Sequence, residues 1–236
     1  MSAKKGFVYP SDGNKITALN AKWYYNWSLT PTLNVMDIPF SHMCWSGNRV
    51  KSLSLAQIDS VLLGFNEPDS PQQSNMTVDD AIALWPQLEN AGYSRLGSPA
   101  TAGNPTDSNG WLAQFMTKAK AANLRVDFIA VHWYAPPNPT SFLNEIDAIY
   151  NLYKLPIWIT EFSPADWKAS TTVPTKFTSN DAIAFMKVVL PALDSRPYVE
   201  KYCWKTRPTS DINLGFAALF NDDGSLTDVG KSYATH

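Results

Sequence analysis

Short apolar segments alternate with amphipathic ones along the whole chain. Residues 61–63 and 128–131 are apolar at successive positions, a pattern typical of parallel strands that are covered on both faces. Strand-like segments of this kind occur over residues 6–9, 22–27, 38–45, 61–66, 95–100, 127–134, 156–162 and 199–206. A parallel sheet flanked by helices is therefore expected.

The segments between these strands show the spacing of amphipathic helices. Apolar residues form one stripe in residues 110–123 and another in residues 141–153, and each stripe marks the face that a helix turns toward a core. A short last helix is expected over residues 227–233. Helices and strands therefore alternate along the chain.

Two further helices are predicted from their capping residues. Thr77 and Ser179 each precede a run of apolar residues at helical spacing, and a hydroxyl side chain there can accept a hydrogen bond from the first free backbone N–H groups. Proline removes a backbone donor and clashes with the preceding turn. We therefore expect Pro86 to kink or break the first of these helices and Pro191 to end the second.

Eight strands with intervening helices suit a chain of 236 residues. The fold class is α/β, and the predicted architecture is a (β/α)8 TIM barrel in a single domain over residues 1–236. A doubly wound open sheet is the competing arrangement. No Gly-x-Gly-x-x-Gly or Gly-Lys-Ser/Thr loop follows a strand, which favours the barrel and argues against a nucleotide cofactor.

Composition narrows the classes of partner. The net charge is −2 at pH 7, and the 19 Lys plus Arg and 21 Asp plus Glu residues are scattered, so nothing indicates binding to nucleic acid or to an anionic membrane. No apolar run reaches the roughly 18–20 residues that span a bilayer. The first five residues lead directly into a predicted strand, without the apolar region of a signal peptide.

The cysteines and histidines indicate neither a metal site nor a fixed disulfide. The three histidines belong to no Cys/His/Asp cluster at ligand spacing, so no metal and no cofactor are expected. Cys44 and Cys203 each lie in a strand-like apolar segment, where a buried free thiol behaves as a small hydrophobic side chain. Free thiols are favoured, and a disulfide between the two stays open.

Two of the predicted strands end on a glutamate. Pro68 cannot donate to a sheet ladder, so it leaves Glu67 at the end of the apolar run that begins at residue 61. Residues 156–164 repeat the arrangement around Glu161. The C-terminal ends of barrel strands converge on one open face, and both carboxyl groups are expected there.

A carboxylate after an apolar strand needs either a partner or a function, because its desolvation costs several kcal/mol. For one glutamate alone, a salt bridge to a Lys or Arg at the barrel mouth is the structural alternative. Two facing carboxyl groups are what glycosidic hydrolysis requires, since one protonates the departing oxygen and the other attacks or activates water. The pair therefore predicts a glycoside hydrolase.

An ordered set of motifs surrounds these glutamates. It consists of Gly64-Phe65-Asn66-Glu67-Pro68-Asp69, Gly97-Ser98-Pro99-Ala100, Val131-His132-Trp133-Tyr134, Ile159-Thr160-Glu161-Phe162 and the tail 215–233. The set runs through most of the chain and resembles glycoside hydrolase family 128, a family of β-1,3-glucanases in clan A. The resemblance implies a β-1,3-glucan substrate and a retaining double displacement, with Glu67 as general acid/base and Glu161 as nucleophile.

The same resemblance suggests roles for neighbouring residues. Asn66 would bind the hydroxyl next to the reacting carbon, although an Asn in this position can also serve a turn. One of His132, Trp133 and Tyr134 would position the nucleophile. Neighbours on a strand point to opposite faces, and the sequence does not decide which of the three points inward.

Tryptophans are frequent, nine in the chain, and several close predicted strands. An indole ring packs on the C–H face of a pyranose while its N–H reaches a hydroxyl. The candidate sugar contacts are Trp27, Trp45, Trp133, Trp167 and Trp204. For each of them the alternative is a core position, and Trp204 is the strongest candidate because it also matches the strand-eight position of the resembled family.

Taken with the resemblance, the sequence predicts a monomeric, secreted or cell-wall protein similar to an endo-β-1,3-glucanase. Its partner would be a β-1,3-glucan polysaccharide or oligosaccharide, with endo and exo action left open. Two rivals remain: a clan A hydrolase with another specificity, such as β-1,4-glucan or mannan, and a carbohydrate-binding barrel without turnover. The presence of both glutamates argues against the second rival.

Overall fold

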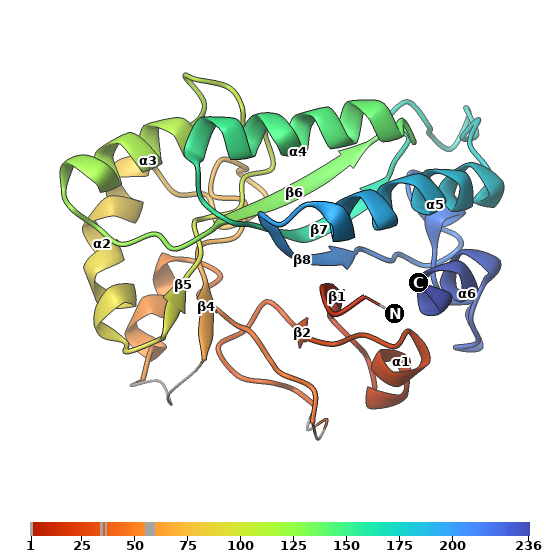
Figure 1. Cartoon of the computed structure of the whole chain (residues 1–236), viewed down its shortest axis with the longest axis horizontal. Helices are drawn as coiled ribbons and strands as arrows, with labels where there is room; N and C mark the ends of the chain where they lie inside the picture. Colours follow the sequence, from red (N-terminus) through yellow and green to blue (C-terminus); the bar gives the residue numbers. More distant parts are fainter. Residues whose placement is uncertain (1, 34, 36, 55–59) are drawn as a thin grey trace.

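The computed structural model describes residues 2–33, 35, 37–54 and 60–236. The elements follow one another as β1 (Lys5–Val8), α1 (Gly13–Ala18), β2 (Tyr24–Tyr25), β3 (His42–Met43), η1 (Gly47–Ser52), β4 (Val61–Leu63), α2 (Val78–Asn90), β5 (Arg95–Leu96), α3 (Trp111–Ala121), β6 (Ile129–Ala135), α4 (Pro139–Tyr153), β7 (Ile157–Pro164), α5 (Ser179–Ser195), β8 (Val199–Trp204), η2 (Gly215–Ala217) and α6 (Asp228–Thr235). Every predicted strand segment overlaps one of these strands (Figure 1).

The strands pair in parallel in the order expected of a barrel. Within the described residues, hydrogen-bonded ladders run in the orders β2-β1-β8-β7-β6 and β3-β4-β5. Single parallel bridges join Tyr24 to Phe40 and Gly97 to Phe128, where the two sheets part. The order follows the chain and β8 pairs with β1, so the predicted α/β fold of the (β/α)8 class is confirmed.

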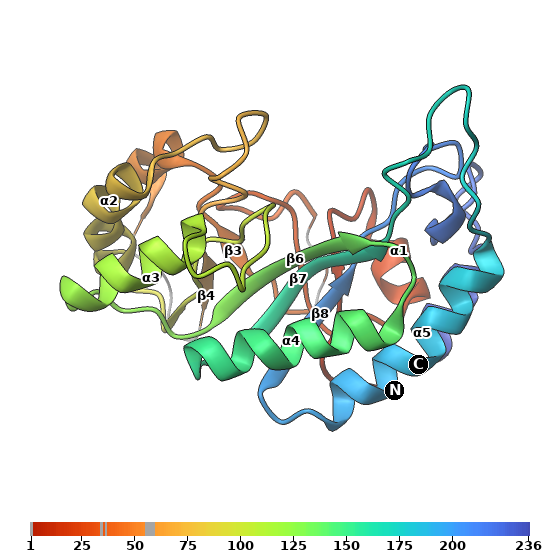
Figure 2. The same cartoon turned by 90° about the horizontal axis from the view of Figure 1, so that it is seen from above.

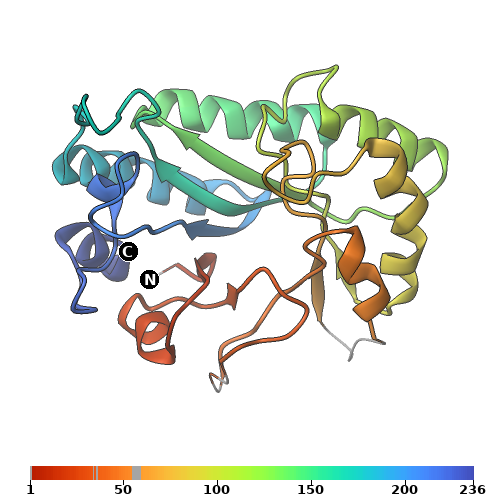
Figure 3. The same cartoon turned by 180° about the vertical axis from the view of Figure 1, so that it is seen from behind.

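Helices cover the outside of the sheet. Aromatic contacts hold two of them there: Phe142 of α4 stacks on Phe162 of β7, and Phe185 of α5 stacks on Trp133 of β6. Seen from above, the loops after β7 and β8 rise together at one side of the molecule (Figure 2). The two chain ends lie side by side (Figure 3), joined by a 3.2 Å hydrogen bond from the Ser2 backbone N–H to the His236 carbonyl.

The structure agrees more closely with the predicted helix starts than with the predicted effects of proline. Thr77 caps α2 as predicted, whereas Thr178, not Ser179, caps α5 in a reciprocal capping box with Asp181. The expected stop at Pro191 is wrong, because α5 continues to Ser195, and α2 likewise continues through Pro86. Both prolines are exposed, so water can bind a carbonyl group that loses its helical partner there.

Two tryptophans predicted to bind sugar belong to the core. Trp204 has no exposed surface, and its indole N–H donates to the Ala217 carbonyl over 3.0 Å. Trp133 is 5% exposed and donates to the Glu145 carboxylate. Both rings pack toward Phe185 of α5. Their strand positions turn them toward the helix layer, so the prediction of a sugar contact at Trp133 and Trp204 is wrong.

Both cysteines are buried free thiols, and burial raises the pKa of the Cys44 thiol to about 12. Lys5 is also buried, and its ammonium donates to the carbonyl groups of Tyr233 and Ala234 near the end of α6. These bonds tie the first strand to the last helix.

None of the described helices combines the length and apolar character needed to cross a membrane.

Replacement of Trp204 tests its assignment to the core. We expect Trp204→Ala to lower the free energy of unfolding by about 3–5 kcal/mol, because it leaves a large cavity between the sheet and α5. Thermal unfolding followed by circular dichroism measures this, with Trp167→Ala as the control, since Trp167 is 61% exposed. A Trp204→Ala protein of unchanged stability and weakened oligosaccharide binding would restore the sugar-contact role.

Candidate active site

A cavity of about 650 Å³ opens where the strands end. Its lining residues are Trp27, Trp45, Asn66, Glu67, Gln73, Ala102, Tyr134, Glu161, Trp167, Lys205, Arg207, Asp211, Asn213 and Leu214. They belong to strand ends or to the loops that follow, the place where a barrel assembles side chains from distant parts of the chain. The structure thus brings both predicted catalytic glutamates into one cavity.

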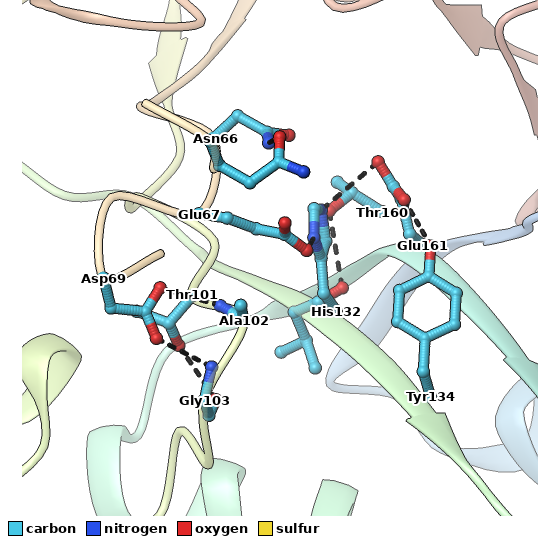
Figure 4. A network of polar contacts seen from close by, with 12 residues as sticks. Asn66, Glu67, Asp69, Thr101, Ala102, Gly103, His132, Tyr134, Thr160 and Glu161 are labelled. Atoms are coloured by element: carbon cyan, nitrogen blue, oxygen red, sulfur yellow. Dashed lines mark hydrogen bonds and ion pairs between the residues drawn. The ribbon is translucent and has the colours of Figure 1, made fainter. Parts of the chain in front are cut away.

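Glu67 is held in position by its backbone. Its φ of 42° is left-handed, a conformation that costs a non-glycine residue roughly 1–2 kcal/mol. The Glu67 N–H donates to the Ala100 carbonyl over 2.7 Å, and Asp69 accepts hydrogen bonds from the backbone of Ala102 and Gly103 (Figure 4). The turn after β4 is therefore clamped to the loop after β5, which fixes the direction of the Glu67 side chain.

Glu161 is a buried carboxylate with donors on both oxygens. Its exposed fraction is 5%. Oε1 accepts from the Trp27 indole N–H over 2.7 Å and from the Tyr25 hydroxyl over 3.1 Å, and Oε2 accepts from the Tyr134 hydroxyl. These donors come from the β2 region and from β6, so the oxygens of Glu161 are fixed from two sides.

His132 lies between the two glutamates (Figure 4). Its Nδ1 is 2.9 Å from Oε1 of Glu67, and its Nε2 is 3.6 Å from Oε1 of Glu161. Both His132 and Tyr134 turn into the barrel, whereas Trp133 between them turns outward, as strand alternation requires. The choice that the sequence left open is thereby settled.

The charges around Glu161 favour its ionised form. Burial alone would raise its pKa, but the neighbouring His132 and Lys205 charges and the hydrogen bonds from Tyr134 and Trp27 lower the pKa below its ordinary value. Burial would likewise lower the pKa of His132, yet the carboxylates of Glu161 and Glu67 raise it. The two shifts each favour the charged form, a carboxylate at Glu161 and an imidazolium at His132.

The side-chain oxygen of Asn66 can accept a hydrogen bond from a ligand. Its side-chain nitrogen donates to Oε1 of Gln73 over 3.3 Å. Its Oδ1 is buried and has no partner among the residues that the structure describes, and such an atom is costly unless something bonds to it. A hydroxyl group of a ligand in the cavity can supply that bond.

The remaining predicted tryptophans, Trp27, Trp45 and Trp167, do line the cavity. Trp167 is largely exposed and its N–H donates to the Tyr134 carbonyl over 3.0 Å, which fixes the direction of an open ring face. Trp27 differs from the prediction, because its N–H is bonded to Glu161 and its ring is stacked on Tyr9 at 4.7 Å between centroids. Trp27 therefore hydrogen-bonds to the Glu161 carboxylate in addition to lining the cavity.

A family model described as the glycosyl hydrolase catalytic core matches residues 6–233. The chain belongs to this family. The solved structure of a family 128 endo-β-1,3-glucanase from Amycolatopsis mediterranei is 31% identical, covers 99% of both chains and has a TM-score of 0.86. A family 128 exo-β-1,3-glucanase from Cryptococcus neoformans is 25% identical over 98% of both chains, with a TM-score of 0.78. The predicted membership of glycoside hydrolase family 128 is confirmed.

A curated relative is much longer than this glycosyl hydrolase core. Alkali-sensitive linkage protein 1 of Schizosaccharomyces pombe is 32% identical over 229 residues, which is 89% of this chain and 39% of the relative. The chain thus spans about two fifths of the length of that protein.

The sequence alone did not identify several residues that surround the two glutamates or line the cavity. Tyr25 lies two residues before Trp27, so strand alternation from the predicted Trp27 could have found it. Lys205 directly follows β8, at the end of a predicted strand. Gln73, Arg207 and the other loop residues carry no comparable signal, because the course of a loop is not readable from its sequence. Within the described residues, no group of His, Cys, Asp or Glu is arranged to hold a metal ion.

Removal of the Tyr134 hydroxyl tests the electrostatic account. That hydrogen bond helps to lower the pKa of Glu161, and a lowered pKa keeps the ionised form present until the pH falls through it. In Tyr134→Phe the Glu161 pKa should rise, so the acidic limb of the kcat/KM profile should move to higher pH. Loss of a hydrogen bond to a charged group should also lower kcat/KM roughly 10-fold or more.

The matched control is Tyr198→Phe, which removes a hydroxyl bonded to the carboxylate of Asp147 outside the cavity. Its acidic limb should stay in place. Equal profiles for Tyr134→Phe and the parent protein would show that the hydroxyl does not influence the ionised carboxylate.

Proposed function

We propose that the chain hydrolyses β-1,3-glucan with retention of anomeric configuration, using Glu161 as nucleophile and Glu67 as general acid/base. The observation that carries the proposal is the different setting of the two carboxyl groups. Glu161 accepts three hydrogen bonds and lies beside two cationic side chains, whereas Glu67 bonds only to His132 through its side chain among the described residues. The surroundings of Glu161 favour its anionic form, and we therefore assign the attack to Glu161 and the proton transfer to Glu67.

In the first step, a Glu161 oxygen attacks the anomeric carbon and the bond to the departing sugar oxygen breaks. Glu67 gives its proton to that oxygen, so the leaving group departs as a neutral alcohol. A covalent glycosyl ester on Glu161 results. The donors on Glu161 hold its oxygens in position before the bond forms, which lowers the entropy cost of the attack.

In the second step, ionised Glu67 takes a proton from a water molecule whose oxygen attacks the same carbon. The bond to Glu161 breaks, and its carboxylate is restored among its donors. Two inversions at one carbon give overall retention. His132 remains beside both carboxyl groups throughout, and its positive charge offsets the negative charge that the two share.

The relatives and the aromatic lining of the cavity support the proposed substrate class. The Amycolatopsis enzyme is described in complex with laminaritriose, and its variants with one glutamate replaced by Gln or Ala are described with laminarihexaose or laminaripentaose. In this chain, Trp45 and Trp167 line the cavity beside the glutamates, and such rings suit the faces of glucose units. A secreted or cell-wall location, expected from the resemblance of the sequence, is part of the proposal.

Replacement of each glutamate by glutamine tests the assignment of roles. Glu67→Gln and Glu161→Gln should each lower turnover of laminarin by several orders of magnitude, because each removes a proton transfer or a bond-forming step. Initial rates of reducing-sugar release measure this. Glu145→Gln is the control, since the Gln carbonyl oxygen can still accept the hydrogen bond of Trp133. Near-normal rates in Glu67→Gln or Glu161→Gln, with native circular dichroism, would overturn the assignment.

Substrate choice is tested on laminarin, cellulose and xylan. We expect cleavage of laminarin, little cleavage of the other two polymers, and no loss of rate after treatment with a chelator. Proton NMR of the first products should show the β anomer before mutarotation. Comparable rates on cellulose, an initial α anomer, or loss of activity with chelator would each contradict part of the proposal.

A further inference from the structure

Lys205 shares the indole of Trp27 with the proposed nucleophile. The Lys205 backbone N–H donates to the Phe162 carbonyl over 2.9 Å, which anchors the residue beside β7. Its ammonium lies 3.7 Å from the centroid of the Trp27 ring. The N–H of the same ring donates to Glu161 over 2.7 Å. A cation and a carboxylate are therefore held by one aromatic side chain, and both line the cavity.

The Lys205 ammonium has unused hydrogen-bonding capacity. A lysine ammonium carries three N–H donors, and none of the residues that the structure describes accepts a hydrogen bond from this ammonium, which instead lies on the Trp27 ring. The side chain is only partly exposed, and a partly buried cation loses hydration that a π face replaces incompletely. Donors of this kind, directed into a cavity, suit a ligand rich in hydroxyl groups.

The charged and titratable groups that act on Lys205 come from several elements. Burial lowers its pKa; Glu161 of β7 opposes this, as do Glu67 after β4 and Cys203 of β8, while Arg207 in the following loop adds to it. In the reverse direction, Lys205 and His132 are the two cationic neighbours that favour ionised Glu161. Lys205 is thus coupled to the nucleophile without touching it.

We propose that Lys205 is a substrate-binding residue: its ammonium, carried on the face of Trp27, donates hydrogen bonds to hydroxyl groups of the glucose unit that reacts with Glu161. This inference rests on the proposed function, since it names a contact to the same sugar. The bound sugar completes the hydrogen bonds of the ammonium. The ammonium in turn supplies positive charge beside the carboxylate that attacks.

Two substitutions separate charge from shape. Lys205→Met removes the charge and the donors while preserving much of the side-chain length, and Lys205→Arg keeps both. Lys201→Met is the matched control, because Lys201 lies on β8, the strand that ends just before Lys205. Its ammonium is 5.9 Å from the ring centroids of Trp23 and Trp158, and the residue does not line the cavity. Each protein is assayed for kcat/KM against pH with laminaripentaose.

Binding is measured separately from turnover. Titration calorimetry compares the affinity of Glu67→Gln for laminaripentaose with that of the double variant Glu67→Gln and Lys205→Met. We expect Lys205→Met to lower kcat/KM about 10- to 100-fold, the loss typical of a hydrogen bond to a charged group, and to weaken binding in the inactive background. The acidic limb should move to higher pH, because the Glu161 pKa rises when a cation is lost. In Lys205→Arg the acidic limb should lie at the same pH as in the parent protein. Lys201→Met should match the parent protein in kcat/KM and in its pH profile.

The outcomes distinguish this inference from the proposed function. A parent protein that leaves laminaripentaose intact would overturn the proposed function and the sugar contact with it. If the parent cleaves laminaripentaose and Lys205→Met shows the same kcat/KM, affinity and acidic limb, only the inference on Lys205 fails. Lowered thermal stability of Lys205→Met with unchanged kinetics of the folded protein would assign the residue a structural role and would also overturn the inference.

Discussion

The burial of one ionised carboxylate is the constraint on which the active site depends. Removing Glu161 from water costs several kcal/mol unless other groups replace its hydration. The barrel supplies them from separate strands: Trp27 and Tyr25 from the β2 region, and His132 and Tyr134 from β6. Because each of these elements must be in place to hold the charge, the fold and the site are parts of one arrangement.

The same constraint explains why the two glutamates differ. Glu161 lies within β7, where regular pairing with β6 brings His132 and Tyr134 alongside it. Glu67 lies beyond β4, in a turn of left-handed backbone that Asp69 clamps to the neighbouring loop. One carboxyl group is therefore enclosed by donors, and the other projects from a turn into the cavity. This difference is the basis of the proposed roles, in which Glu161 acts as an anion and Glu67 as a proton donor.

The fold and the two glutamates could be predicted from the sequence because both depend on local patterns of apolar and polar residues. Apolar runs that lead to Glu67 and Glu161 place both residues near the C-terminal ends of strands, and parallel strands bring those ends to one face. Prediction from the sequence failed at Trp204 and Trp133, where aromatic residues at strand ends suit the helix layer as well as the cavity, and only packing decides between them. It also missed Lys205, whose proposed role depends on the Trp27 ring, about 180 positions away along the chain. The two residues come together because the last strand, β8, pairs with the first, β1.

Covalent capture of the nucleophile tests the central claim most directly. The protein would be incubated with a 2-deoxy-2-fluoro-β-laminaribiosyl fluoride, and its peptides would then be analysed by mass spectrometry. The fluorine at carbon 2 of this reagent slows both steps, whereas its reactive fluoride leaving group speeds formation of the ester, so the ester accumulates. We expect a single added glycosyl group on Glu161 and no such group in Glu161→Gln. Labelling of Glu67 in place of Glu161 would contradict the proposed roles of the two glutamates. So would a reaction that leaves no labelled peptide and gives a product of inverted configuration, because a water molecule would then attack directly.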